Sequence, residues 1–301
     1  MLLTDDRGEA VRLQRLPNRI VSLVPSDTYT LLRLGAASRV VGRTEYCVEP
    51  ADRVQGIATV GGTKNPDIER ILELRPDLVV MNREENTRRD WEKFVGHGIA
   101  VLTTCPIRMA EGAAQVGRLA RLVGDLDAAA KELVREAYRM TTSFEKAPSE
   151  TIRAFVPIWM DPLMTINDGT FISDVLRCAG ATNVFADRER RFPLTADLGR
   201  GPEFAPEKTQ GRDTRYPRVT LDEVRARDPE LIVLPDEPHP FSEADAEVFR
   251  SANIPSLAPE NVRFCVGKSL MWPGLMSIEH HEHIRGLVQA AARVASTRRA
   301  R

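Results

Sequence analysis

A pattern that occurs twice along the chain constrains the fold more than any other feature. Residues 69–80 read ERILELRPDLVV and residues 222–233 read DEVRARDPELIV, so the second copy follows 153 positions after the first. Each copy is typical of a short amphipathic helix, a proline, and then a buried β-strand. The repeat predicts two α/β lobes built alike, with a ligand-binding cleft between them. Two further pairs follow in the same order: LRLGAASRVV (32–41) with LRCAGATNVF (176–185), and GIAVL (98–102) with NIPSL (253–257).

Strand and helix patterns alternate through both halves of the chain. The run RIVSLV (19–24) is apolar and β-branched, which is typical of a buried parallel strand, and Ser26 or Asp27 is expected to cap the helix that follows. Such alternation predicts parallel sheets, so the expected fold class is α/β with two Rossmann-like lobes. Further strands are predicted at 40–41, 77–81, 99–103 and 152–158, and helices at 67–74, 87–95, 109–123 and 170–178.

One longer helix is predicted between the two copies. No glycine or proline interrupts the stretch before Pro148. We interpret it as a stiff connector at 126–147, between an N-terminal lobe (1–125) and a C-terminal lobe (148–301). An ordinary core helix is the alternative, because an apolar face fits either role. The apolar residues of this face recur at spacings of three and four: Leu126, Ala130, Leu133, Ala137, Met140 and Phe144.

Composition excludes several classes of protein. Basic and acidic residues number 42 and 43 among 301, so no net charge favours nucleic acid or an anionic membrane. The four cysteines form no CxxC pair, which argues against a structural zinc site. No apolar run of about 18 residues predicts a transmembrane helix. The N-terminus, MLLTDDRGEAVRL, lacks the apolar core of a signal peptide, which predicts either a cytoplasmic protein or a sequence that begins after a removed leader.

Several motifs together resemble a known family. They are RIVSLVPS at 19–26, Tyr46-Cys47 four residues after Gly42, VGGTKNPDIERILELRPDLVV at 60–80, and EEN at 84–86. The combination resembles the periplasmic-binding-protein family of iron-siderophore and vitamin B12 receptors (helical-backbone metal receptors), and most of all its cobalamin-binding members. The resemblance runs from about Asp5 to about Ala295. It implies two α/β lobes joined by one long helix (a class III periplasmic-binding-protein fold), a location outside the cytoplasm, and a role as the substrate-binding protein of an ABC transporter.

The resemblance also implies a surface for docking onto a permease. In the family, one acidic residue per lobe meets arginines of the membrane permease, and the matching positions are Glu69 and Asp222. The family usually has glutamate at both positions, so Asp222 is a shortened version with Glu223 beside it. An acid at the start of a helix is favoured by the helix dipole in any case, and this capping role is the alternative.

Candidate ligand-binding residues follow the predicted strands, because ligands of parallel α/β sheets bind beyond the carboxyl ends of the strands. The chain has three tryptophans and four tyrosines, so finding Tyr46, Trp159 and Trp272 near these ends favours stacking on a flat macrocycle such as a corrin. Packing at a hinge is the alternative for each ring. The full set of candidates is Ser26, Asp27, Tyr46, Thr63, Asn82, Glu84, Trp159, Asp161, Tyr216, His239 and Trp272.

The segment 193–217, PLTADLGRGPEFAPEKTQGRDTRYP, breaks the α/β pattern. It is rich in proline, glycine and charge and has no apolar period, which predicts a long surface loop inserted in the second lobe. A disordered spacer and a ligand lid are the two interpretations of this insertion.

Three histidines are weak candidates for metal ligands. His239 follows the strand of the second copy, where it suits an axial ligand to cobalt or iron; a loop residue is the alternative. His280 and His283 lie three apart in EHHEH and are expected on one face at the start of the last helix. An exposed polar helix start is the alternative for them. HExxH, GxSxG and GxxxxGK[ST] are absent, so no catalytic residue is assigned.

Three hypotheses of function follow. In the favoured one, a monomeric binding protein closes on a cobalamin-like or other metal chelate, does no covalent chemistry and delivers the ligand to an ABC permease. In the second, a cytoplasmic chelatase-like or corrinoid-handling enzyme uses the same fold. In the third, the ligand is haem or a ferric siderophore, and an anionic chelate would meet Arg43, Arg83 or Lys268. A corrinoid or ferric chelate is thus the expected ligand, without a covalent cofactor, and nucleic acid is not an expected partner.

Overall fold

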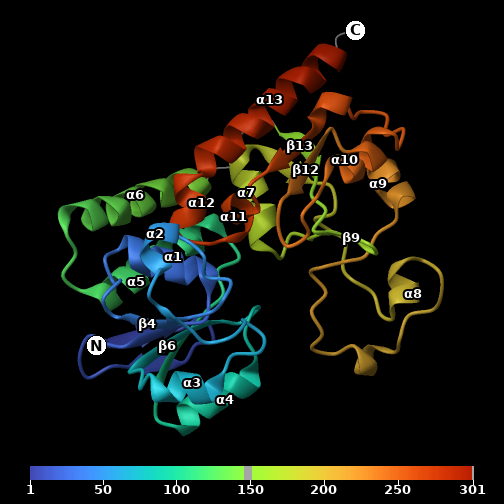
Figure 1. Ribbon diagram of the computed structural model, residues 1–301. Coiled ribbons are helices and arrows are strands. Elements are labelled where there is room, and N and C mark those ends of the chain that lie inside the picture. Colours follow the sequence, from blue (N-terminus) through green and yellow to red (C-terminus); the bar gives the residue numbers. More distant parts are fainter. Residues whose placement is uncertain (146–150, 300–301) are drawn as a thin grey trace. The chain divides into compact units, whose positions relative to one another are not determined.

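The computed structural model describes residues 1–145 and 151–299 (Figure 1). The chain divides into two compact units, each with a sheet of its own. The first unit comprises Met1–Ser143 and Trp272–Ile278, and the second comprises Phe144–Met271 and Glu279–Arg301. Among the described residues, none of the helices has the length and apolar character that crossing a membrane requires.

The first unit is built on a five-stranded parallel sheet with the strand order β5-β4-β3-β6-β7. The inner strands β3 and β6 are buried along their whole length, which explains their continuous apolar runs. A short antiparallel hairpin of β1 (Leu2–Thr4) and β2 (Ala10–Arg12) precedes the sheet. The strands of the sheet are β3 (Ile20–Ser22), β4 (Val40–Arg43), β5 (Ala58–Thr59), β6 (Leu78–Asn82) and β7 (Ala100–Thr104).

Helices cover both faces of this sheet, with α1 and α5 on one face and α3 and α4 on the other (Figure 1). Ile71 of α3 and Phe94 of α4 are fully buried against Val21, Val79 and Val101 of the strands. This pairing of apolar helix faces with apolar strands is what the alternating sequence pattern predicted. The helices are α1 (Pro25–Arg33), α2 (Ala51–Val54), α3 (Ile68–Glu73), α4 (Arg88–Gly96) and α5 (Met109–Val123).

The second unit is built on a four-stranded parallel sheet with the strand order β11-β8-β12-β13. Phe155, Phe185 and Phe249 are fully buried at its core, with ring centroids 5.4 Å and 5.9 Å apart. Its strands are β8 (Ile152–Phe155), β11 (Ala181–Asn183), β12 (Leu231–Pro235) and β13 (Val262–Cys265), and a hairpin of β9 (Trp159–Met160) and β10 (Leu163–Met164) follows β8. Its helices are α7 (Phe171–Ala179), α9 (Leu221–Arg227), α10 (Glu243–Arg250), α11 (Gly267–Met271) and α13 (His281–Arg299).

The repeat in the sequence is a repeat in the structure. The order β4-β3-β6-β7 of the first sheet matches β11-β8-β12-β13 of the second, so the two repeated strands β6 and β12 lie in separate sheets, as predicted. After each repeated helix, a non-glycine residue with a positive φ stands directly before the proline, Arg75 at 46° and Asp228 at 49°. The α/β class predicted from the sequence is therefore confirmed.

A matching arginine fixes each copy of the turn. Arg19 and Arg153 lie at the first strand of each copy. The Nε–H group of each donates to a backbone carbonyl at the end of the repeated helix, at 2.7 Å and 2.9 Å. Their backbone N–H groups donate to the acid that follows each proline, Asp77 at 2.9 Å and Glu230 at 3.1 Å. The same sequence pattern therefore specifies the same turn twice.

The long helix predicted between the copies is α6 (Ala128–Glu145). It begins two residues later than predicted because Asp127 caps it, accepting the N–H of Ala130 at 2.7 Å. The predicted end at 147 lies outside the described residues. The division into units falls within this helix, between Ser143 and Phe144. The lobe bounds 1–125 and 148–301 stay a prediction.

One local prediction is wrong, and one sequence match does not extend to the structure. Ser26 and Asp27 do not cap α1, because Pro25 occupies its first position and Val24 precedes it without a side-chain cap. The sequence match of 253–257 with 98–102 does not extend to a strand: the strand that takes the place of β7 in the second sheet is β13, and Pro255 lacks the N–H that a ladder needs.

Candidate functional site

Two asparagines build the turn after β6. Asn86 Oδ1 accepts the backbone N–H of Asn82 at 2.7 Å, and Asn82 Oδ1 accepts that of Glu84 at 2.7 Å. Asn86 Nδ2 donates to the carbonyl of Thr63 at 2.8 Å, and Lys64 Nζ donates to the carbonyl of Glu84. The structure thus brings three predicted site residues together at this strand end, Thr63, Asn82 and Glu84. Both asparagines are buried, and their amide groups hold the loop in shape.

Tyr46 presents an open ring at the carboxyl end of β4, with 57% of its surface exposed. It lies beside the Gly61-Gly62 turn, where Gly61 has a φ of 84°. A Cβ at Gly62 would stand 2.5 Å from Asn65 Oδ1 and 3.4 Å from Tyr46 Cε2. Because these glycines lack a Cβ, the turn allows a close approach of neighbouring atoms.

Asp27 is a buried carboxyl group on α1, one of the helices that cover the first sheet. It accepts hydrogen bonds from Thr104 Oγ1 at 2.9 Å and Gln115 Nε2 at 3.2 Å. Burial raises the pKa of Asp27 to about 6, against the lowering effect of these two hydrogen bonds. Sequence reasoning missed Gln115, although a lone amide on the apolar stripe of α5 was a usable signal. Ser26 beside Asp27 is also buried, so neither side chain is open to solvent.

Aromatic rings come together at the carboxyl end of the second sheet. Trp159 begins β9 and His239 follows β12, and their ring centroids lie 5.4 Å apart. Phe241, which the sequence analysis missed, packs edge-on to His239 with centroids 4.6 Å apart. Trp159 is 43% exposed, and its Nε1 donates to the carbonyl of Asp161 at 3.0 Å. The three rings form one partly open aromatic surface.

The other two aromatic candidates, Trp272 and Tyr216, lie outside the cluster of Trp159, His239 and Phe241. Trp272 belongs to the first unit, although the sequence assigned it to the C-terminal lobe, and it is 8% exposed. Tyr216 is the last residue but one of the insertion, and the Arg215 guanidinium lies 5.6 Å from its ring. Backbone hydrogen bonds tie this end to the segment after β10, with Asn167 N–H donating to the Arg215 carbonyl at 2.9 Å. A ligand-binding role for Tyr216 and Trp272 stays a prediction.

The histidines of EHHEH do not start one helix together. α12 (Leu275–Glu279) ends before His280, and α13 begins at His281. His280 and His283 are exposed, whereas His281 is buried edge-on against Phe144, with centroids 5.0 Å apart, and burial lowers its pKa. His239 Nε2 faces Asp245 Oδ2 at 3.8 Å. Within residues 1–145 and 151–299, no three His, Cys, Asp or Glu side chains are grouped so as to hold a metal ion.

The two docking candidates occupy the same position in their helices. Asp67 caps α3 and Thr220 caps α9, so Glu69 and Asp222 are each the second helical residue. Both are exposed. Asp222 pairs with Arg225 on the same helix at 2.6 Å, a surface pair that contributes little to stability. An exposed acid in the first turn is what docking onto a cationic partner requires, and docking itself stays a prediction.

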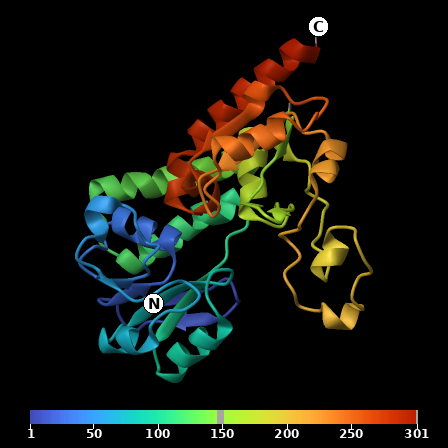
Figure 2. The same cartoon turned by 45° about the vertical axis from the view of Figure 1, so that its right-hand side comes forward.

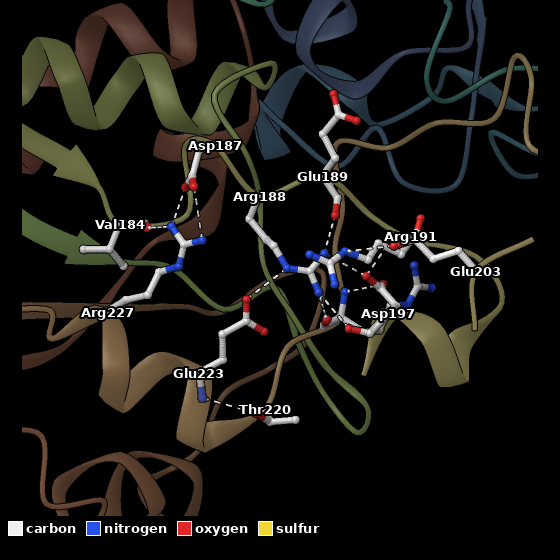
Figure 3. A network of polar contacts seen from close by, with 11 residues as sticks. Val184, Asp187, Arg188, Glu189, Arg191, Asp197, Glu203, Thr220, Glu223 and Arg227 are labelled. Carbon is white, nitrogen blue, oxygen red and sulfur yellow. Dashed lines mark hydrogen bonds and ion pairs between the residues drawn. The ribbon is translucent and has the colours of Figure 1, made fainter. Parts of the chain in front are cut away.

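One buried arginine orders the insertion (Figure 3). Arg188 is 6% exposed, and its guanidinium donates to Glu223 at 2.9 Å, to Asp197 Oδ1 at 3.1 Å and to the Asp197 carbonyl at 2.7 Å. The buried Asp197 carboxylate also accepts the backbone N–H groups of Arg191 at 2.9 Å and Arg218 at 2.7 Å. The interpretation of this segment as a disordered spacer is therefore wrong, because a buried and hydrogen-bonded ion pair holds both of its ends.

This network also joins the insertion to the helix of the docking candidate. The loop carries α8 (Leu194–Asp197) and a 3-10 turn, η1 (Pro206–Lys208), and it extends away from β12 and β13 of its own unit (Figures 1 and 2). Because Arg188 binds Glu223, Asp222 is the acid that remains exposed in the first turn of α9. Arg188 lies in the charged run ADRERR, which gives no sign of which arginine is buried.

The fold and its repeated turn agree with a comparison of the sequence against known families. The sequence profile of the family described as periplasmic binding protein matches residues 20–237. The chain belongs to the periplasmic binding protein family. The matched range begins at β3 and ends just after β12, so it contains both repeats and both docking candidates. This membership makes the chain a solute-binding protein and not an enzyme.

The chain is also similar to individual proteins, one curated relative and several solved structures. The vitamin B12-binding protein of Pectobacterium carotovorum subsp. carotovorum (strain PC1) is 25% identical over 181 residues, which cover 59% of this chain. The match spans 65% of that relative's own length. Among solved structures, the periplasmic vitamin B12 binding protein BtuF of Vibrio cholerae has a TM-score of 0.69 at 21% identity and covers 92% of this chain and 98% of its own. The periplasmic heme-binding protein RhuT from Roseiflexus sp. RS-1 has a TM-score of 0.69 at 15% identity, with coverages of 91% and 99%. These two structures show the fold, a class III periplasmic-binding-protein fold.

Proposed function

We propose that this protein captures a metal chelate, with a cobalamin-like corrinoid as the first choice and haem or a ferric siderophore as the alternatives. The observation that carries the proposal is the exposure of aromatic rings at the carboxyl ends of both sheets, Tyr46 in one and Trp159 in the other. A flat macrocycle gains from stacking on such rings, and their partial exposure leaves them available for it. The metal belongs to the cargo, so the protein needs no covalent cofactor of its own.

Relatives support this choice of ligand. The Pectobacterium relative is named a vitamin B12-binding protein, and the structural neighbours are named for vitamin B12 and haem. These ligands share a planar ring system around a metal. The cluster of Trp159, His239 and Phe241 suits such a ring, because it combines flat apolar faces with one imidazole.

A titration tests the ligand class. Cyanocobalamin, haemin and a ferric hydroxamate siderophore are each added to the purified protein and followed by calorimetry and visible absorbance. The proposal expects saturable one-to-one binding of one of the three. If none binds, the proposed chelate class is wrong.

We further propose that the protein serves an ABC importer outside the cytoplasm, as a monomer that docks through Glu69 and Asp222. Their matched positions at the starts of α3 and α9 support this proposal. In a pull-down with the cognate permease, the double variant Glu69→Lys with Asp222→Lys should lose complex formation while ligand binding is unchanged. Glu73→Lys, at the end of α3, is the matched control and should keep the complex. A double variant that still forms the complex would leave these acids only a role in their helices.

A further inference from the structure

A cavity of about 240 Å³ lies within the first unit, beyond the carboxyl ends of β6 and β7. Its size equals about eight waters at their share of liquid volume, so it suits a ligand of roughly eight or nine heavy atoms. It is smaller than the pockets that hold drug-sized ligands. The residues that line it are Arg7, Met81, Asn82, Arg83, Asn86, Thr87, Arg88, Trp91 and Thr103.

The walls of this cavity come from β6 and the turn after it, from β7, from α4 and from the turn of the first hairpin. Thr103 lies in β7, Trp91 in α4, and Arg7 in the turn of the β1-β2 hairpin. The Arg7 guanidinium stacks on the Trp91 ring, 3.7 Å from its centroid. The hairpin is fixed to the sheet, because the N–H of Asp6 donates to the Thr103 carbonyl at 2.9 Å and Asp6 pairs with Arg118. The cavity is therefore built from anchored groups.

Two residues that line the cavity each carry a buried polar atom without a hydrogen-bond partner in the part of the chain that the structure describes. Trp91 Nε1 and Thr103 Oγ1 are buried, and neither has a hydrogen-bond partner among the described residues. Thr103 is 4% exposed as a whole. An indole N–H can only donate, and a hydroxyl can donate as well. A buried donor without a partner is costly, so both atoms indicate an acceptor that the protein does not itself supply.

The charge of the lining points to an anion. Three of the nine lining residues are arginines, and none is an acid. Arg88 pairs with Glu92 on its own helix at 2.9 Å, and Arg7 is stacked on Trp91. Arg83 has no carboxylate partner among residues 1–145 and 151–299, and its side chain is exposed at the carboxyl end of β6. The side-chain amide of Asn86 is already hydrogen-bonded within the turn, through both its oxygen and its nitrogen, so it is not counted among the groups that would bind a ligand.

We propose that this cavity is a binding site for a small carboxylate with an apolar body, such as an aromatic monocarboxylate. The carboxylate accepts from Arg83, Thr103 Oγ1 and Trp91 Nε1, and the apolar body packs on Met81 and the indole ring. Charge-assisted hydrogen bonds from a guanidinium give the site its preference for an anion. The site lies in one unit, and it does not depend on the metal-chelate proposal.

Benzoate is the probe, because it has the size and chemistry inferred, and neutral benzamide is its shape-matched control. Calorimetry with the full-length protein should give saturable benzoate binding at about 1 mM or tighter. Benzamide should bind about tenfold more weakly. The indole N–H resonance of Trp91, assigned with Trp91→Phe, should move on addition of benzoate.

Two variants and a control separate this site from weak surface binding. Arg83→Gln should weaken benzoate binding about tenfold or more, and Thr103→Val, which keeps the shape of the side chain, about fivefold. Arg89→Gln removes an exposed arginine of α4 that does not line the cavity, and it should leave benzoate binding unchanged. Absence of benzoate binding, equal binding of benzoate and benzamide, or a Trp91 resonance that does not move would each overturn the assignment.

Discussion

Replacing the buried carboxyl of Asp27 by an amide should stabilise the first unit at neutral pH. In the protein, Thr104 Oγ1 lies 2.9 Å from Asp27 and 3.2 Å from the Met81 carbonyl. A hydroxyl donates only one proton, so a protonated Asp27 can donate to Thr104 while Thr104 donates to Met81. Asparagine preserves this arrangement, because its Nδ2 can donate to Thr104 and its Oδ1 can accept from Gln115.

The size of the effect follows from the pKa of Asp27. Burial raises it from 3.8 to about 6, which corresponds to about 3 kcal/mol. Because the folded state holds the proton more tightly, the contribution to stability is complete below pH 3.8 and is lost as the pH rises through about 6. Asp27→Asn removes this dependence. The gain in free energy of unfolding should be about 3 kcal/mol near pH 7.5 and should shrink to about 1 kcal/mol near pH 4.5.

Urea unfolding followed by tryptophan fluorescence measures this gain. Trp91 and Trp272 both belong to the first unit, so a Trp159→Phe background reports on that unit alone. Wild type and Asp27→Asn are compared in this background at the two pH values, and titration of all other groups cancels in the difference. The gain is the free energy of unfolding of Asp27→Asn minus that of wild type. If this gain is no larger near pH 7.5 than near pH 4.5, the argument from burial is refuted.

Three further substitutions test the ligand surface, the insertion and the glycine turn. Trp159→Ala should weaken chelate binding by about 1–3 kcal/mol in a calorimetric titration, taking the range known for stacking on bases. Tyr138→Ala, which removes a somewhat more exposed ring on α6, should have no effect. Arg188→Met leaves a buried carboxylate unpaired and should destabilise the insertion by about 3–5 kcal/mol, seen as faster proteolysis within 190–215; an unchanged cleavage rate would contradict this. Gly61→Ala should lower the melting temperature more than Gly56→Ala. Both glycines have a positive φ, but only at Gly61 would an added Cβ meet backbone atoms, at 2.9 Å and 3.1 Å. Equal losses in melting temperature would contradict the predicted collision.

Periodic features of the sequence predicted the fold well. The repeated turn is specified by residues close in sequence, a helix end, a proline and the acid after it, and Arg75 and Asp228 adopt the same left-handed conformation before Pro76 and Pro229. The alternation of apolar strands and amphipathic helices needed only local patterns, so β6, β7, α4 and α5 lie within a residue of their predicted bounds. The insertion lacked such a pattern, and its order depends on contacts between residues far apart.

Long-range polar contacts were the part that sequence reasoning could not reach. Arg188 meets Glu223 35 positions away, and Asp27 meets Gln115 88 positions away. Neither pair has a spacing that local geometry enforces. The predicted cap by Ser26 or Asp27 failed for a different reason. Both residue types commonly cap helices, but Pro25 already occupies the first helical position, so Val24 precedes the helix.

The absorption spectrum of the protein isolated from its native host tests the central claim most directly. Corrinoids, haem and ferric siderophores each absorb visible light with their own spectrum, and the protein itself has no visible chromophore. The account predicts that the isolated protein, or the apo-protein after incubation with an extract of its host, carries one of these spectra in a one-to-one ratio. A protein that stays colourless through both steps would contradict the proposal that its ligand is a metal chelate.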